Sequence, residues 1–140
     1  MSRHKARVIA FQALFSYDMG GEGLDELLTL NWVENVEELD TETSDFARIL
    51  ISGTVNHLGE IDDCIKKHLT PKWQFERLNR VTVAILRISI FSLLYQEDMP
   101  VSVVIDQAIK ISKEYGEDDA FKFINAMLDT ISKVAPADQN

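Results

Sequence analysis

The stretch RVTVAILRISIFSLLY, residues 80–95, is apolar on nearly all sides when it is wound into a helix. A helix that is hydrophobic all round is normally covered by other helices, so this segment is expected to be the central and most buried one. Residues 81–95 are too few for a membrane span, which needs about 20 apolar residues, and they include Arg87. We therefore predict a buried central helix and no membrane segment.

Apolar residues at three- and four-residue steps predict helices on both sides of this segment. Ser2 is placed to cap the first helix and Gly20-Gly21 to stop it, while Thr70-Pro71 is typical of a helix start. The expected helices cover residues 3–19, 24–35, 41–69, 70–78, 80–95 and 100–115, and a last helix, capped by Asp118 or Asp119, reaches past Ile131. The predicted fold class is all-α with about seven helices.

The domain organisation follows from length and from the absence of a repeat or a long linker. A chain of 140 residues is of the usual size for one domain. We expect a single domain of two packed helical subdomains, an N-terminal half of residues 1–69 and a C-terminal half of residues 70–135, with a tail at 136–140. Gly53 and Gly59 are expected to bend the long third helix, Gly116 to end the sixth in the left-handed conformation, and Pro136 to lie beyond the last.

The residues that carry most enzyme chemistry are missing or scattered. Cys64 is the one cysteine, which excludes an internal disulfide and a cysteine-rich zinc site, and favours a reducing cytoplasm. His4, His57 and His68 lie far apart, and no phosphate loop, dinucleotide turn, nucleophile elbow or zinc-protease motif occurs. We therefore expect no enzyme activity, no metal and no cofactor.

Charge is sorted along the chain, although the net charge is −9. Residues 22–45 contain nine acidic residues and no lysine or arginine, whereas the first 17 residues contain Arg3, His4, Lys5 and Arg7 and no acid. Cations at a helix start oppose the helix dipole, so another role must favour them. Arg3 and Arg7, one turn apart, should point the same way, as contacts to a phosphate backbone would. Charge alone leaves nucleic-acid contact and simple solubilisation as equal alternatives.

Longer motifs resemble the family of the bacterial transcription antitermination factor NusB. The opening RHKAR, residues 3–7, runs into AFQALF, residues 10–15, and the C-terminal half has AILRI at 84–88 and VIDQA at 104–108. YGEDD at 115–119 and KFIN at 122–125 complete the ordered signature, which covers nearly the whole chain. The resemblance implies an all-α fold of two helical subdomains and no catalysed reaction.

The resemblance also implies partners and site residues. Members of the family bind single-stranded boxA-type RNA together with the ribosomal protein NusE, within the antitermination complex of RNA polymerase. Carried over by position, one RNA surface comprises Arg3, His4, Lys5 and Arg7, a second comprises Tyr115, Asp119, Lys122 and Phe123, and the NusE interface includes Phe15, Glu76 and Thr82.

Several of these positions have a structural alternative. Phe123 and Phe15 also suit the core, and Asp119 also suits a helix cap. Thr82 stands where the family often has a charge, so this interface is expected to rely more on apolar contact. The alternative to RNA binding is a helical adaptor that uses its acidic segment or an exposed groove to hold a basic partner.

Overall fold

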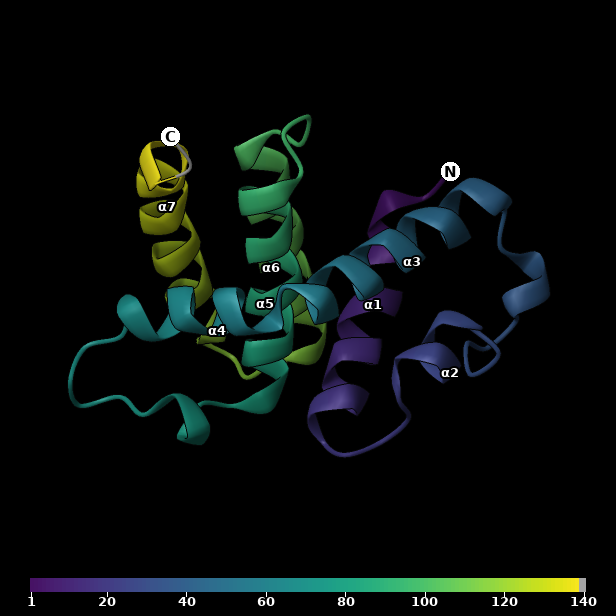
Figure 1. The fold of residues 1–140 in the computed structure, drawn as a ribbon, viewed down its shortest axis with the longest axis horizontal. Coiled ribbons are helices and arrows are strands. Elements are labelled where there is room, and N and C mark those ends of the chain that lie inside the picture. The colour runs from purple at the N-terminus through teal and green to yellow at the C-terminus, as the bar shows by residue number, and fades with distance from the viewer. Residues whose placement is uncertain (139–140) are drawn as a thin grey trace.

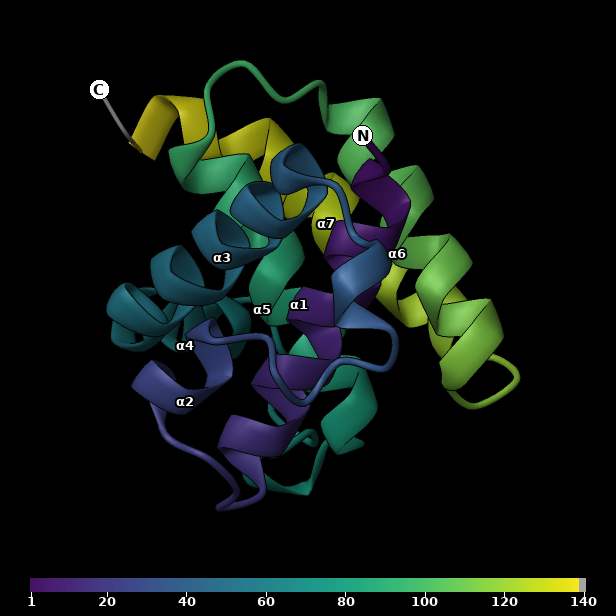
Figure 2. The same ribbon diagram turned by 90° about the vertical axis from the view of Figure 1, so that its right-hand side faces the viewer.

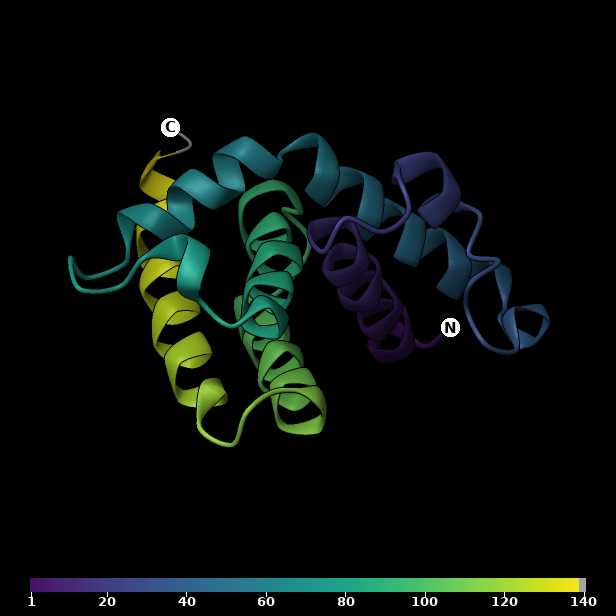
Figure 3. The same ribbon diagram turned by 90° about the horizontal axis from the view of Figure 1, so that it is seen from below.

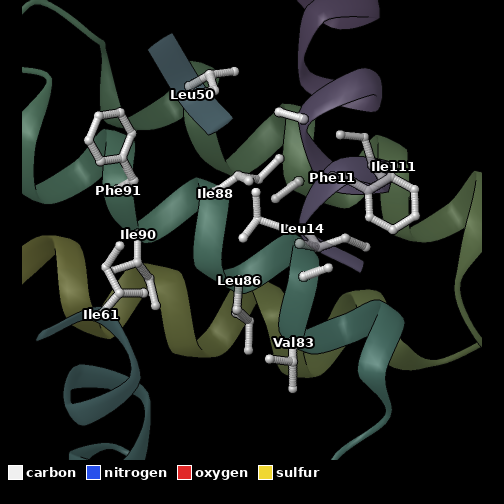
Figure 4. Packing of buried hydrophobic residues seen from close by; sticks show 14 of the residues in the cluster. Phe11, Leu14, Leu50, Ile61, Val83, Leu86, Ile88, Ile90, Phe91 and Ile111 are labelled. Atoms are coloured by element: carbon white, nitrogen blue, oxygen red, sulfur yellow. The ribbon is translucent and has the colours of Figure 1, made fainter. Parts of the chain in front are cut away.

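Helix α5, which spans Arg80–Tyr95, runs through the centre of the structure, as its apolar sequence predicts (Figure 1). Eleven consecutive residues, from Thr82 to Ser92, are buried. Figure 4 shows side chains of other helices, among them Phe11, Leu50 and Ile111, gathered around those of α5. This central helix is the element on which the other helices pack.

The computed structural model describes the backbone of residues 1–138, with side chains to residue 134. Over this range the chain forms seven α-helices and two short 3-10 helices, and no strand. They are α1 (Arg3–Asp18), α2 (Leu24–Leu28), η1 (Val36–Glu38), α3 (Thr41–Asn56), α4 (Leu58–Lys67), η2 (Phe75–Arg77), α5 (Arg80–Tyr95), α6 (Val101–Tyr115) and α7 (Ala120–Asp138). The all-α prediction is confirmed. No helix in the described range is both long and apolar enough to cross a membrane.

The helices surround α5 on several sides. Helix α7 lies on one side of α5 and α1 to α3 on the other (Figures 1 and 3), while α4 and α6 lie on opposite faces (Figure 2). Buried residues form one continuous cluster from α1 to α7, so the two expected subdomains share a core. The division near residue 69 stays a prediction.

Helix α1 begins and ends where its sequence predicts. The Ser2 hydroxyl accepts a hydrogen bond from the backbone N–H of Lys5, 3.2 Å away, which satisfies a free donor at the helix start. At the other end Gly20 has φ +81°, and the N–H of Gly21 donates to the carbonyl of Ser16 over 2.8 Å. This is the Schellman type of helix end, and glycine adopts its left-handed turn without a steric cost.

The second helix is shorter than predicted. It stops at Leu28 instead of continuing to Asn35, because Leu30 turns into the left-handed region at φ +59° and buries its side chain completely. Trp32 therefore lies outside the helix, where its indole N–H donates to the carbonyl of Leu27 over 2.9 Å. Periodicity alone does not reveal such a turn, since leucine rarely adopts positive φ.

The long third helix is two helices, α3 and α4, that meet at His57. The break lies between the two glycines and at neither of them. Gly53 has another role: a β-carbon there would lie 2.1 Å from Cζ of Phe91, so glycine allows α3 to approach α5. Gly59 faces open space, because apart from its own stretch of helix backbone nothing lies within 4 Å of the point that a β-carbon there would occupy.

Three further predictions about helix ends are wrong. Residues 70–74 form a loop with only the turn η2 after it, because Phe75 and Leu78 leave the helical path to reach the core. Gly116 is extended, at φ −96° and ψ −177°, and its small size matters because a β-carbon would lie 2.9 Å from the Ser112 carbonyl oxygen. Helix α7 continues through Pro136 to Asp138. Proline has no backbone N–H, but so close to the helix end this removes only one helical hydrogen bond.

Arg87, the buried charge in the middle of α5, is held by carboxylates of two other helices. Its guanidinium donates to both oxygens of Asp62 on α4, over 2.9 and 2.8 Å, and to Asp18 on α1 over 3.1 Å. Arg80 makes two more bonds to Asp18, over 2.7 and 3.0 Å, and donates to the Phe75 carbonyl over 3.1 Å. Burial alone would lower the pKa of Arg87, but the hydrogen bonds and charges of Asp62 and Asp18 outweigh it and raise that pKa.

Gly53→Ala is expected to destabilise the protein, although alanine is the better helix former. The gain in helix propensity is about 1 kcal/mol, whereas displacing the Phe91 ring from a packed core costs about 1 to 3 kcal/mol. Urea unfolding followed by circular dichroism measures the balance. Gly59→Ala, with open space around the added methyl group, is the matched control and should be neutral or stabilising; a Gly53→Ala protein as stable as that control would contradict the packing argument.

Asp18 should contribute to the pH dependence of stability. Its hydrogen bond to Arg80, together with the charges of Arg80 and Arg87, lowers the pKa of the Asp18 carboxyl below its ordinary value, although burial opposes this. A lowered folded pKa gives stability that is fully present above the unfolded pKa of about 4 and is lost as the pH falls through the folded value. Asp18→Asn should therefore lower stability at pH 7 and flatten its fall below about pH 4. Urea titrations at several pH values test this, and an unchanged acid slope would contradict it.

Candidate nucleic-acid interface

The first turn of α1 presents two free cations to solvent. Arg3 and Lys5 are exposed, and among the described residues no carboxylate pairs with either of them or with Arg7. Arg3 lies over the ring of Phe46 on α3, with 5.6 Å from its guanidinium carbon to the ring centroid. These side chains are therefore available for an anionic partner and are not neutralised within the chain.

Arg7 differs from its neighbours because only 5% of it is exposed. Its guanidinium lies over the same Phe46 ring, 5.4 Å from the centroid, and one nitrogen donates to the sulfur of Met99 over 3.1 Å. Arg3 and Arg7 do point the same way, as their spacing predicts, but they converge on an aromatic ring. Burial, with the charge of Arg3 adding to it, lowers the pKa of Arg7. As placed here, Arg7 supports the surface from beneath rather than facing solvent.

His4 ties the first turn of α1 to α6. Its Nδ1 lies 2.7 Å from Oε1 of Gln107, and its Nε2 lies 3.3 Å from Oε1 of Glu114. Further along the two helices the rings of Phe11 and Tyr115 meet, with centroids 5.3 Å apart. Figure 2 shows the N-terminal end of α1 beside α6. The first predicted RNA surface thus lies beside α6, which ends at Tyr115 of the second one, although about a hundred residues separate the two helices in the sequence.

The second predicted surface is formed by the end of α6 and the start of α7. Tyr115 is 45% exposed although one side of its ring contacts Phe11. Asp119 and Lys122 are both exposed, and their side chains pair over 3.6 Å, so the lysine partly neutralises the carboxylate. Asp119 directly precedes α7, which fits the expected capping position. Phe123 is half-buried and contacts Trp73 of the loop before η2, with ring centroids 6.4 Å apart.

A groove of about 570 Å³ lies between η2, the start of α5 and the start of α7. The Asn79 amide donates to a carboxylate oxygen of Glu117 over 3.0 Å and so links the two walls. The groove is lined by Trp73, Arg77, Leu78, Asn79, Thr82, Glu117, Asp119, Ala120 and Phe123. Two predicted RNA residues and one predicted partner residue therefore border the same hollow.

The three residues predicted to bind NusE differ in accessibility. Glu76 is exposed on η2, whereas Phe15 is half-buried and packs against the core. Thr82 is only 5% exposed but lines the groove. The structure brings Thr82 close to Asp119 and Phe123, which are predicted RNA residues, and it leaves Phe15 in the core position that its helical spacing also allowed.

Titratable residues elsewhere are engaged in structural contacts. The rings of His57 and Tyr95 lie 4.0 Å apart, and the Tyr95 hydroxyl donates to Glu60. Burial, with the hydrogen bond to Glu60 adding to it, raises the pKa of Tyr95 to about 12. In the described part of the chain, histidine, cysteine and acidic side chains form no group suited to a metal ion.

Sequence reasoning missed Trp73 of the groove, whereas Arg77 lies in the segment 76–82 on which the family resemblance places the NusE interface. Trp73 follows Pro71, and the sequence pattern predicts only a brief helix for its segment. The available signal was a large aromatic residue in the polar run PKWQ, residues 71–74, where nothing in the pattern provides a buried face. Such a tryptophan is more often found at a binding surface than a smaller apolar residue is.

The fold and this surface define an all-α binding protein that has exposed cations at the start of α1 and a separate groove between η2, α5 and α7, bordered by the rings of Trp73 and Phe123. Residues 4–133 match the NusB family, and the chain belongs to that family.

Named relatives agree with this assignment. The transcription antitermination protein NusB of Treponema pallidum (strain Nichols) is 44% identical over 135 residues, which cover 96% of this chain and 95% of that protein. The solved structure of T. maritima NusB superposes with a TM-score of 0.87 at 36% identity, covering 99% of this chain and 96% of that one. A crystal structure of the antitermination factors NusB and NusE with double-stranded RNA matches with a TM-score of 0.83 at 30% identity, covering 96% and 99% of the two chains.

The burial of Arg7 predicts a stability effect that separates it from Arg3 and Lys5. Arg7→Ala should lower the free energy of unfolding by about 1 to 3 kcal/mol, because it removes the packing of a long side chain against Phe46 and Met99. The free energy of unfolding of Arg7→Met should stay close to that of the parent. Methionine fills much of the volume of the arginine side chain, and the substitution removes a buried charge that no carboxylate of the described residues neutralises.

Thermal unfolding of both Arg7 variants, with Lys5→Ala as the exposed control, measures the effect. An Arg7→Ala protein that melts like the Lys5→Ala control would show that Arg7 is not structural.

Proposed function

We propose that this protein is a transcription antitermination factor that binds single-stranded boxA-type RNA together with the ribosomal protein NusE. Family membership supports this function, since its relatives are named transcription antitermination proteins and one solved relative is a complex with NusE and RNA. The chain works by holding RNA and protein, and it catalyses no reaction of its own. Its place of action is the cytoplasm, where RNA polymerase and ribosomal proteins meet.

The observation that supports the proposal is the contact between α1 and α6. His4 contacts Gln107 and Glu114, and Phe11 contacts Tyr115, so the predicted RNA residues at the start of α1 lie beside the helix whose end carries the predicted RNA residue Tyr115. Arg3 and Lys5, which pair with no carboxylate in the described part of the chain, suit the phosphates of a strand. Exposed rings at Tyr115 and the groove suit its unpaired bases.

Modest affinity is expected from the chain alone. The protein is acidic overall, and only a few cations face this surface, so binding should weaken steeply as salt rises. NusE adds a second RNA-binding surface and converts part of the interaction into an intramolecular one. We therefore expect most of the RNA affinity to come from the complex of this protein with NusE.

A titration of fluorescently labelled boxA-type RNA, with and without NusE and at several salt concentrations, tests this function. Lys5→Ala should weaken binding to different RNA sequences about equally and should reduce the slope of log K against log salt by about 1. The expected control is Lys133→Ala, which removes an equally exposed lysine at the far end of α7 and should bind like the parent.

Two results would overturn the proposal. One is RNA affinity that NusE does not increase. The other is capture of NusE that survives ribonuclease together with no measurable RNA binding by the pair, which would favour an adaptor that contacts only protein.

A further inference from the structure

Trp73 is the most exposed aromatic side chain around the groove, and no assigned function uses it. Its side chain is 53% exposed, although its backbone is held by a 3.0 Å hydrogen bond to the Thr70 carbonyl. Leaving half of an indole in water forgoes much of the stabilisation that its burial would bring. An exposed tryptophan at the edge of a groove is therefore typical of a binding site.

The geometry of the two rings leaves an aromatic face open. The centroids of Trp73 and Phe123 are 6.4 Å apart and the ring planes are inclined by 41°, so the rings meet obliquely and do not stack on each other. A flat group can lie against the indole with the Phe123 ring at its edge. The groove volume of about 570 Å³ is within the usual range of small-ligand sites and accepts a base with part of its sugar.

The charges around the groove suit a nucleotide better than an apolar peptide. Arg77 on one wall has no carboxylate partner among the described residues, and Lys122 stands beside Asp119 at the other. Glu117 is already engaged by the Asn79 amide. A phosphate beside an inserted base would thus meet Arg77 on one wall and the Lys122–Asp119 ion pair at the edge of the other, while the base itself meets aromatic carbon.

We propose that Trp73 is a stacking platform for one unpaired base of the bound RNA, which enters the groove with Phe123 at its edge. This role rests on the proposed function and extends the RNA surface from the α6–α7 corner to the loop before η2. Trp73 contributes affinity through stacking, which is tolerant of base identity and nearly independent of salt.

Tryptophan fluorescence tests the proposal directly because the chain has only two tryptophans. Trp32→Phe removes the other indole, which lies near α2 and bonds to Leu27, and leaves Trp73 as the sole reporter. Addition of single-stranded boxA-type RNA with NusE should quench the Trp73 emission in step with binding measured by anisotropy of labelled RNA. Emission that stays unchanged when the RNA is fully bound would overturn the proposal.

Substitution at position 73 separates stacking from other roles. Trp73→Ala should weaken RNA binding about 5- to 150-fold, the range for loss of one stacked base, with an unchanged salt slope and an unchanged melting temperature. Trp73→Phe should retain most of the affinity, since a smaller ring still stacks. Lys5→Ala is the comparison variant, because it should reduce the slope of log K against log salt, which Trp73→Ala should leave unchanged.

The outcomes distinguish this proposal from the function on which it rests. RNA binding that depends on Lys5 but is unchanged in Trp73→Ala would overturn the role of Trp73 and leave the function intact. A Trp73→Ala protein that loses NusE binding in the absence of RNA would show that the groove holds a protein side chain, and it too would overturn the proposal. A parent protein that binds no RNA even with NusE would overturn both.

Discussion

The ion pairs of Arg87 are the constraint around which the helices are arranged. A guanidinium within the most buried helix is tolerable only if carboxylates reach it with good geometry, because an unpaired buried charge is strongly destabilising. Asp18 at the end of α1 and Asp62 in α4 supply them, and Arg80 secures Asp18 from a second direction. The three helices are therefore oriented by one polar cluster, whereas the apolar core by itself would accept several packings.

Much of the fold could be predicted from local patterns, and the misses have definite causes. The uniform hydrophobicity of residues 80–95 located the central helix, and Ser2 with Gly20 located both ends of α1. The ends of α2 and the loop before η2 could not be predicted, because Leu30 and Phe75 leave helical geometry to reach a core that only the tertiary fold creates. Asp18 and Asp62, 44 residues apart in the sequence, gave no sign that they share one arginine.

The candidate site was predictable as a set of charges but not as a surface. The sequence showed that cations and no acids lie near the start of the chain, and among the described residues no carboxylate pairs with Arg3 or Lys5. One-turn spacing placed Arg7 beside Arg3 but could not reveal Phe46, which comes from α3 and covers Arg7. The role of Trp73 could not be predicted either, because its neighbour in the fold, Phe123, lies 50 positions further along the chain.

The close approach of α3 to α5 has an evolutionary consequence. The ring of Phe91 occupies the volume that any side chain at position 53 would need. Among homologues, size at these two sites should be correlated, so that a bulkier residue at 53 accompanies a smaller one at 91. Divergence can pass through such an exchange only if the smaller residue arrives first, because the reverse order produces an overcrowded intermediate.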